Sequence, residues 1–378
     1  MKRSFIYLAG CALALTACTS EEVVDVGVHR NPIGFENAVM KQSRAGDQAL
    51  QGDLTKDSFD KFLVYGFYTM KDQTNNPIQV FSGEPVTKSV DGGKTSWSYV
   101  NTRYWVPEAS YNFFAYSCAD VALDNIYGTV GLSLNENSSE RQMTISNYRC
   151  DQVHNHDLIV AQARNLVGQA ITEDNPTPNP NVSLKFEHVL TKIDAVFTSE
   201  FSGEYDVVIK DVRIVNFRNI GSFSSNNSKW SAEREVNSTG TVVPASIQLP
   251  FGGPNGEGVS NAAEYNSNGS VKRAEKKAAT GSVYMIPYSY SQNDVQLRFS
   301  LDLYKGEEHT SATLVLGRDM TGTWSPKWEP GKYYTYNIRL TGTATNLQPI
   351  VFETATDMNV EGWTSGSSTA TDISFSAN

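Results

Sequence analysis

The chain has 378 residues and a net charge of -10, with 41 acidic and 31 basic side chains scattered along its length. This charge pattern provides no basic patch, which excludes nucleic acid and argues against anionic lipid headgroups as partners. The length is sufficient for two domains, and the plentiful Tyr, Phe, Thr, Ser and Asn residues favour strands joined by turns over helices.

The first residues predict a secretory signal. Lys2 and Arg3 form a basic start, and the apolar run over residues 5–15 is too short to remain as a membrane-spanning helix. The run leads into Leu15-Thr-Ala-Cys18, which resembles the bacterial lipobox. We therefore predict a signal peptide over residues 1–17 and acyl chains on Cys18 that hold the protein to a membrane. The alternative is a permanent one-pass anchor with a buried cysteine.

A short strand is predicted next, over residues 33–39. Ile33, Phe35 and Val39 fall on one face of an extended chain, because side chains alternate between the two faces of a strand. The segment is followed by Lys41-Gln-Ser-Arg44-Ala45-Gly46, a stretch typical of an accessible loop.

Hydrophobic alternation predicts strands through the rest of the chain. Residues 295–303 and 334–340 place their apolar side chains on one face. Continuous apolar runs at residues 62–68, 111–116 and 158–161 are short enough to be strands covered on both faces. No long segment has helical periodicity, so we predict an all-β protein built of sandwiches.

A domain boundary is predicted at the proline-rich stretch over residues 175–181. Its three prolines favour a stiff, extended connector that cannot form a full ladder of hydrogen bonds.

Two cysteines remain beyond the signal and the lipidation site, at Cys118 and Cys150. An oxidising compartment permits a disulfide between them, and two free buried thiols are the alternative.

Residues with ligand or catalytic chemistry are sparse. His154 and His156 share a face of an extended segment and present two imidazoles to a cation, but a solvated or hydrogen-bonded strand end is the favoured interpretation. His188 is predicted to be structural. No nucleophile–base arrangement or selected carboxylate pair is present, so we expect no enzyme, no metal and no cofactor.

The C-terminus ends in a short amphipathic segment behind a polar stretch over residues 364–371. Ile373, Phe375 and Ala377 alternate with polar residues, which predicts a strand on a tether. Such a strand either pairs within its own domain or reaches another molecule.

Six short motifs follow one another along the chain. They are residues 102–105, 111–116, 157–161, 184–190, 328–338 and 360–363. Together with the lipobox, these motifs resemble the fimbrillin family of Bacteroidetes, the lipoprotein precursors of type V pili and their relatives.

The resemblance implies two transthyretin-like Greek-key β-sandwich domains in tandem, over residues 45–180 and 181–378. It also implies a propeptide over residues 18–44, removed by an arginine-specific protease that cuts between Arg44 and Ala45. Arg30 is the nearest rival site. We expect the strand at residues 33–39 to fill a groove in the first domain until cleavage, and Ile373, Phe375 and Ala377 to supply a donor strand to a neighbouring subunit.

The implied function is a structural subunit of a cell-surface fimbria, with other fimbrial subunits as partners. The lipid on Cys18 would anchor the chain to the outer membrane, and this anchoring would be transient if the propeptide is removed. A host or bacterial surface ligand is a further expected partner. One alternative is a lipid-anchored anchor or tip adhesin. Another is a glycan-binding lipoprotein that stacks sugar rings on Trp97 and Trp105 or on Trp324 and Trp328.

Overall fold

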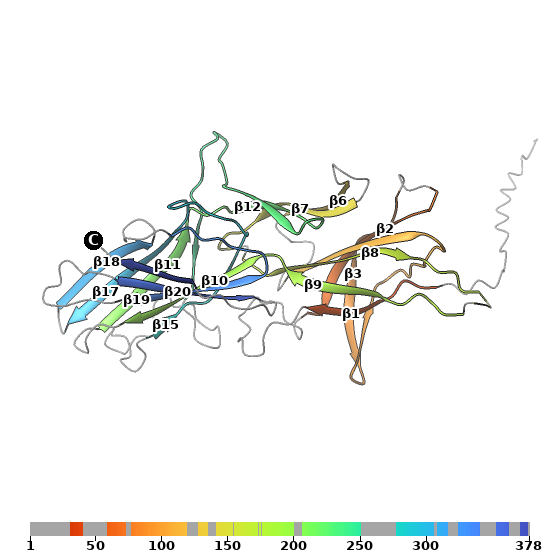
Figure 1. Cartoon of the computed structure of the whole chain (residues 1–378), viewed down its shortest axis with the longest axis horizontal. Coiled ribbons are helices and arrows are strands. Elements are labelled where there is room, and N and C mark those ends of the chain that lie inside the picture. The colour runs from red at the N-terminus through yellow and green to blue at the C-terminus, as the bar shows by residue number, and fades with distance from the viewer. Residues whose placement is uncertain are drawn as a thin grey trace, which may run out of the picture.

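The computed structural model of the chain describes residues 31–40, 59–72, 77–118, 128–134, 141–153, 155–172, 174, 176–199, 206–250, 277–305, 308–316, 324–340, 353–362 and 371–376. Every regular element in these ranges is a β-strand, so the predicted all-β fold is confirmed. The molecule is elongated, with a barrel at one end and stacked sheets at the other (Figure 1). Within the described ranges, no helix has the length and apolar character required to cross a membrane.

Seven strands form the closed barrel, in which each strand has two neighbours and no edge is left open. In ring order they are β1 (Phe35–Met40), β4 (Lys94–Ser98), β3 (Ile78–Asp91), β2 (Lys61–Thr69), β5 (Ser110–Cys118), β8 (Leu158–Val167) and β9 (Val182–His188). Aromatic side chains such as Phe62, Phe81, Phe113 and Phe186 fill its interior, all with at most 1% of their surface exposed. Their burial supplies the main favourable free energy of this part of the fold.

Two further sheets face each other at the other end. The first contains β15 (Lys277–Ala279), β16 (Val283–Met285), β10 (Thr191–Ser199), β19 (Lys332–Leu340), β20 (Glu353–Gly362) and β21 (Thr371–Ser376). The second contains β14 (Ser246–Gln248), β11 (Asp206–Val215), β17 (Gln296–Lys305) and β18 (Glu308–Leu316). Phe197 of β10 meets Phe299 of β17 edge-on, with ring centroids 4.9 Å apart, so the inner faces of the two sheets share one core.

A fourth sheet joins the two ends. It contains β13 (Lys229–Glu233), β12 (Ile220–Ser224), β7 (Arg141–Arg149) and β6 (Thr129–Leu134). The side chains of Ile145 and Phe223, on neighbouring strands, are buried in the same core as Phe197 and Phe299. This sheet therefore extends the larger core towards the barrel.

The strands predicted from hydrophobic patterns are confirmed, and their burial explains the two kinds of pattern. In β17, Leu297, Phe299 and Leu301 are buried while Arg298 between them is exposed. In β5, Phe113 points into the barrel core and Phe114 into the larger core. A continuous apolar run thus marks a strand that forms a wall between two cores.

Strand pairing crosses the predicted domain boundary twice. β9, which follows the proline-rich connector, pairs with β8 and β1 in the barrel. β7, which precedes the connector, pairs with β12. The division into tandem domains at residues 180 and 181 stays a prediction, and the barrel combines six strands from before this boundary with β9 from after it.

The two candidate disulfide cysteines are free thiols buried in the larger core. The structure therefore contains two free buried thiols, the alternative considered above, and no disulfide between Cys118 and Cys150. Cys150 donates a hydrogen bond to the carbonyl oxygen of Tyr284 at 2.8 Å. Burial raises the pKa of both thiols to about 12, because the low-dielectric core disfavours a thiolate, and nearby Asp157 adds to the shift at Cys118.

We predict that Cys118 and Cys150 resist alkylation at pH 8 in the folded chain and react once urea unfolds it. The folded pKa lies above the ordinary 9.0, so the folded state keeps protons that the unfolded chain releases, and stability falls as the pH rises beyond about 9. Mass spectrometry of the two cysteine-containing peptides measures the modification. Rapid labelling of the folded chain, or recovery of the two peptides as a linked pair, would contradict the prediction.

Candidate strand-exchange site

The barrel is closed by a strand that lies upstream of Arg44. β1 runs antiparallel to β4, with Phe35 opposite Trp97, and parallel to β9, with Phe35 opposite Val182. We call the position between β4 and β9 the β1 slot. The ring is closed only because β1 lies between β4 and β9. Closure of the barrel therefore depends on the segment at residues 31–40, the first part of the chain that the structure describes.

Phe35 is the main apolar contact of β1 with the barrel. Its side chain is only 3% exposed, and Ile33, on the same face, is 1% exposed. The Phe35 ring makes edge-on contacts with four aromatic rings at centroid distances of 5.7–6.1 Å, those of Phe62, Phe81, Tyr99 and Phe113. Burial of one such side chain contributes about 1.5–3 kcal/mol, and each favourable aromatic pair adds about 0.5–1.5 kcal/mol.

Backbone hydrogen bonds fix the segment in register with its neighbours. Ile33 N donates to Arg103 O at 2.8 Å, and Ile33 O accepts from the Tyr99 hydroxyl at 2.6 Å. Val182 N donates to Gly34 O at 2.7 Å. If the segment left, these partners would lose their bonds, and a buried unpaired polar group costs about 1–3 kcal/mol.

A polar contact ties the entry of the segment to the proline-rich connector. Asn31, 5% exposed, donates from Nδ2 to Asn179 Oδ1 at 2.7 Å. The Asn179 amide in turn donates to Val167 O at 2.9 Å, which fixes its orientation. The connector, which leads into β9, therefore also holds Asn31, four residues before β1 begins.

Gly34 lies against the side chain of Asn181, the residue before β9. A Cβ atom placed on Gly34 would overlap the Asn181 side-chain oxygen. Asn181 is exposed, so its amide can move aside for a small substituent but not for a large one. The segment that fills the β1 slot thus presents an apolar residue, a small residue and an aromatic residue in sequence.

The residues predicted to take part in lipidation and cleavage, Cys18, Arg44 and Ala45, lie outside the described ranges. Val39 is present as backbone in β1, opposite Lys185. Ile373 and Phe375 lie in β21, whose backbone pairs antiparallel with β20 at the edge of its sheet, and Ala377 is again outside the described ranges.

The four tryptophans considered for sugar stacking do not form an exposed platform, so the glycan-binding alternative built on them is wrong. Trp105, Trp324 and Trp328 are buried, with at most 6% exposed. Trp97 is half-buried, and its ring lies 5.2 Å from that of Phe62. The sequence could not separate exposed from buried indoles, because both kinds occur beside polar residues in strands.

The structure supports a structural role for one predicted histidine and does not describe another. His188 Nδ1 lies 3.0 Å from Asp157 Oδ1 and both side chains are buried, so its predicted structural role is confirmed. His154 lies outside the described ranges. Among the residues that the structure describes, no group of three or more His, Cys, Asp or Glu side chains is arranged to hold a metal ion.

We predict that Phe35→Ala lowers the free energy of unfolding of the uncleaved chain by about 3–5 kcal/mol, because it leaves a cavity among four aromatic rings. Glu36→Ala is the matched control, since Glu36 is the exposed neighbour in the same strand, and its effect should stay within about 0.5 kcal/mol. Urea denaturation measures both. Equal effects of the two substitutions would show that β1 does not pack as described.

The fold is similar to that of a solved Bacteroides structure. A fimbrial protein from Bacteroides vulgatus aligns with a TM-score of 0.51 and 15% identity, covering 88% of this chain and 100% of that chain. A candidate cell adhesion protein from Bacteroides uniformis aligns with a TM-score of 0.43 and 13% identity, covering 89% and 98%. No curated protein sequence matches the chain.

A family model supplies the stronger comparison. The model described as fimbrillin-like matches residues 44–363. The match extends over most of the chain, and the family consists of structural proteins, in agreement with the prediction of a non-enzymatic protein. The chain therefore belongs to the fimbrillin-like family.

Proposed function

We propose that the chain is a structural subunit of a cell-surface fimbria that is exported as a lipoprotein, cut after Arg44 and polymerised by strand exchange. The carrying observation is that β1, the segment upstream of Arg44, fills a slot lined by aromatic side chains in an otherwise complete barrel. The family match begins at residue 44 and ends at residue 363, so it leaves out both the strand that fills the slot and the proposed donor.

Cleavage would turn a closed ring into an open one. Once residues 31–40 leave, β4 and β9 each present an unpaired edge, and the rings around Phe35 face water. An open edge beside an apolar groove pairs readily with another strand. A strand from a second subunit in this slot makes a heterologous contact that repeats without closing, which produces a filament.

The C-terminal segment has the same residue pattern as the segment that now fills the slot. Ile33-Gly34-Phe35 fills the slot now, and Ile373-Ser374-Phe375 has the same two large residues around a small one. The serine is compatible with the tight position beside Asn181, because that exposed amide can move. This match supports Ile373 and Phe375, with Ala377 behind them, as the donor strand.

The arrangement of the strands favours exchange between molecules. In Figure 1 the barrel and β1 lie at the right, whereas β20, the neighbour of β21, lies at the left. β21 pairs with β20 at the end of its sheet, so release of β21 requires only one ladder of hydrogen bonds to break. The donor of one subunit is thus placed far from its own slot.

The lipid on Cys18 would deliver the precursor to the outer membrane and hold it there until the cut. Because Cys18 precedes Arg44, cleavage would separate the mature subunit from its anchor. A subunit that escaped cleavage would stay lipidated and serve as the anchor of a fibre.

We predict that the mature subunit begins at Ala45 and that Arg44→Ala yields a lipidated chain that does not enter fibres. Lys41→Ala is the control, since it removes a nearby positive charge and leaves the arginine. Intact mass, N-terminal sequencing and electron microscopy of surface fibres provide the measurements. Normal fibres formed by the Arg44→Ala variant would refute the cleavage step.

We predict that Ser374→Trp and Phe375→Ala abolish polymerisation of the cleaved subunit, because the first clashes beside Asn181 and the second leaves the aromatic pocket empty. Ser374→Gly is the matched control, as it reproduces the small residue of the present β1. Size-exclusion chromatography after cleavage follows the polymer. Polymers formed by the Ser374→Trp variant would rule out this segment as the donor.

A further inference from the structure

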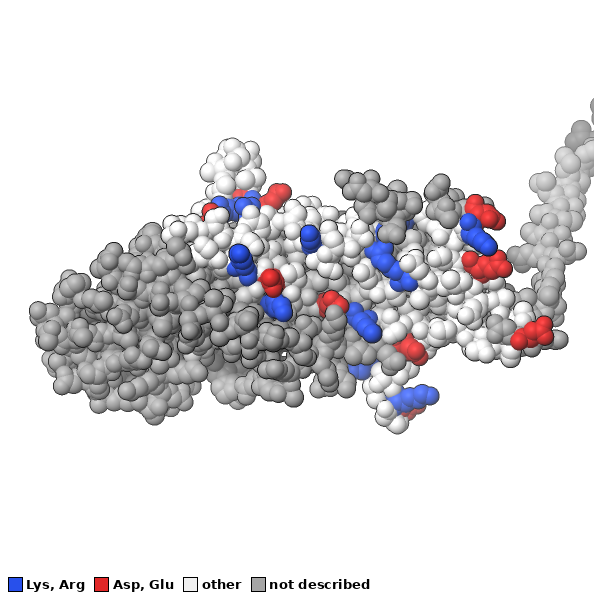
Figure 2. Space-filling model, in the orientation of Figure 1, with Lys and Arg blue, Asp and Glu red and all other residues white. Residues whose placement is uncertain are grey.

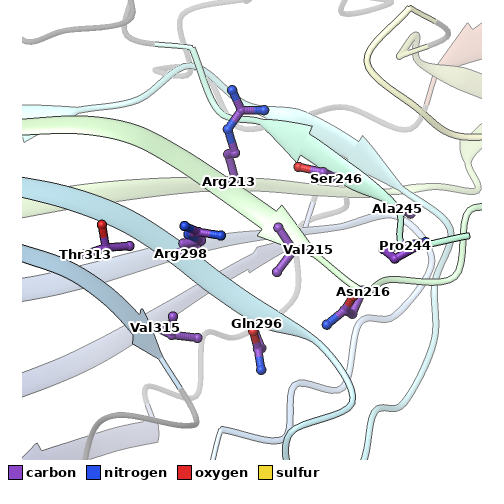
Figure 3. A pocket seen from close by; sticks show the side chains of 10 residues that line it. All are labelled: Arg213, Val215, Asn216, Pro244, Ala245, Ser246, Gln296, Arg298, Thr313 and Val315. Atoms are coloured by element: carbon purple, nitrogen blue, oxygen red, sulfur yellow. The ribbon is translucent and has the colours of Figure 1, made fainter.

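A cavity of about 620 Å3 lies on the outer face of the sheet that contains β14, β11, β17 and β18, away from the β1 slot (Figure 3). Its volume falls within the range of about 300–1,000 Å3 that is usual for small-molecule sites. Arg213 and Val215 come from β11, Arg298 and Gln296 from β17, and Thr313 and Val315 from β18. The segment before β14 closes one side with Pro244 and Ala245.

The two arginines are directly opposite each other. Arg213 and Arg298 are register partners on neighbouring strands, so their side chains leave the same face of the sheet. Like charges in such a position destabilise the sheet, and an anion placed between them would relieve the repulsion. The site is positive although the chain as a whole has a net charge of -10.

Existing acidic groups neutralise the pair only in part. Asp211 Oδ1 lies 3.8 Å from Arg213 Nη2, beyond hydrogen-bond distance, and both side chains are substantially exposed. Within the part of the chain that the structure describes, the Arg298 guanidinium has no hydrogen-bond or ion-pair partner. Its five donors are therefore available to a planar, bidentate acceptor such as a carboxylate.

The remaining lining fits a sugar ring better than an inorganic anion. Val215 and Pro244 provide apolar surface for the carbon face of a ring, whereas Val315 is buried and adds little to it. Asn216, Gln296, Ser246 and Thr313 provide amides and hydroxyls that can bond to ring hydroxyl groups. None of the ten lining residues is aromatic, so a neutral sugar would have no ring to stack on and recognition would depend on the charge.

We propose that this cavity binds a sugar that carries a carboxylate, with Arg298 and Arg213 holding the acid group and the polar rim selecting the hydroxyls. The site would give the fimbrial surface an affinity for acidic glycans. It does not use β1, β21 or Arg44, so it stands whether or not the chain polymerises by strand exchange.

The test is calorimetric titration of the full chain with glucuronic acid and with N-acetylneuraminic acid, which represent the two common sources of sugar carboxylates. Glucose, the methyl ester of glucuronic acid and inorganic phosphate are the comparison ligands. We expect at least one of the two acids to bind, the neutral sugars to bind at least about tenfold more weakly, and affinity to fall as salt is added. Equal binding of the methyl ester, tighter binding of phosphate, or no binding of either acid would overturn the proposal.

Variants assign the binding to the cavity. Arg298→Gln should weaken binding by about tenfold or more, since it removes a charge-assisted hydrogen bond. Lys229→Gln removes an exposed charge on β13, outside the residues that line the cavity, and should leave the affinity unchanged. Thermal unfolding of each variant confirms that it folds. Unchanged affinity of a folded Arg298→Gln variant would show that the sugar binds elsewhere.

Discussion

The structure depends on the insertion of one strand into a barrel. β1 completes a ring of seven strands, and Phe35 lies at the centre of four aromatic contacts. All of these contacts are non-covalent, so they are the same in kind whether the strand belongs to this chain or to another. Covalent connection supplies only a high effective concentration of the strand at its own slot. A cut between β1 and β2 would remove that advantage and leave the slot open to competition.

The barrel is mechanically connected to the rest of the molecule through shared walls. Residues of β5 and β8 alternate between two cores, with Ile159 in the barrel and Leu158 and Val160 in the larger core. A close-packed wall transmits strain to both sides, because protein interiors leave few voids. Loss of β1 would therefore change the packing around β5. The larger core has its own sheets, and none of them includes β1. This arrangement suits a subunit whose slot changes occupant while the rest of the molecule stays folded.

Charge has a different role from packing in this chain. On the face seen in Figure 2, Lys and Arg alternate with Asp and Glu over the described surface and do not gather into one field. Against that mixed surface, the opposed Arg213 and Arg298 stand out, because adjacent strands force their like charges together. The slot thus depends on burial of apolar side chains, whereas the ligand proposed for the cavity would be held by directional charge-assisted hydrogen bonds.

Hydrophobic patterns alone predicted strands at residues 33–39, 62–68, 111–116, 158–161, 295–303 and 334–340, because apolar runs and apolar–polar alternation follow the two-residue period of a strand. The same patterns predicted that the strands at residues 111–116 and 158–161 are covered on both faces. Local patterns could not predict that β9, beyond the proline-rich connector, lies beside β1, that Trp105, Trp324 and Trp328 are buried, or that Cys118 and Cys150 are free. The fold also brings Arg213 and Arg298, which are far apart in the sequence, to paired positions on neighbouring strands. These features escape prediction because alternation reports which face of a strand is apolar, whereas the partner of each strand is selected by long-range packing that no local pattern records.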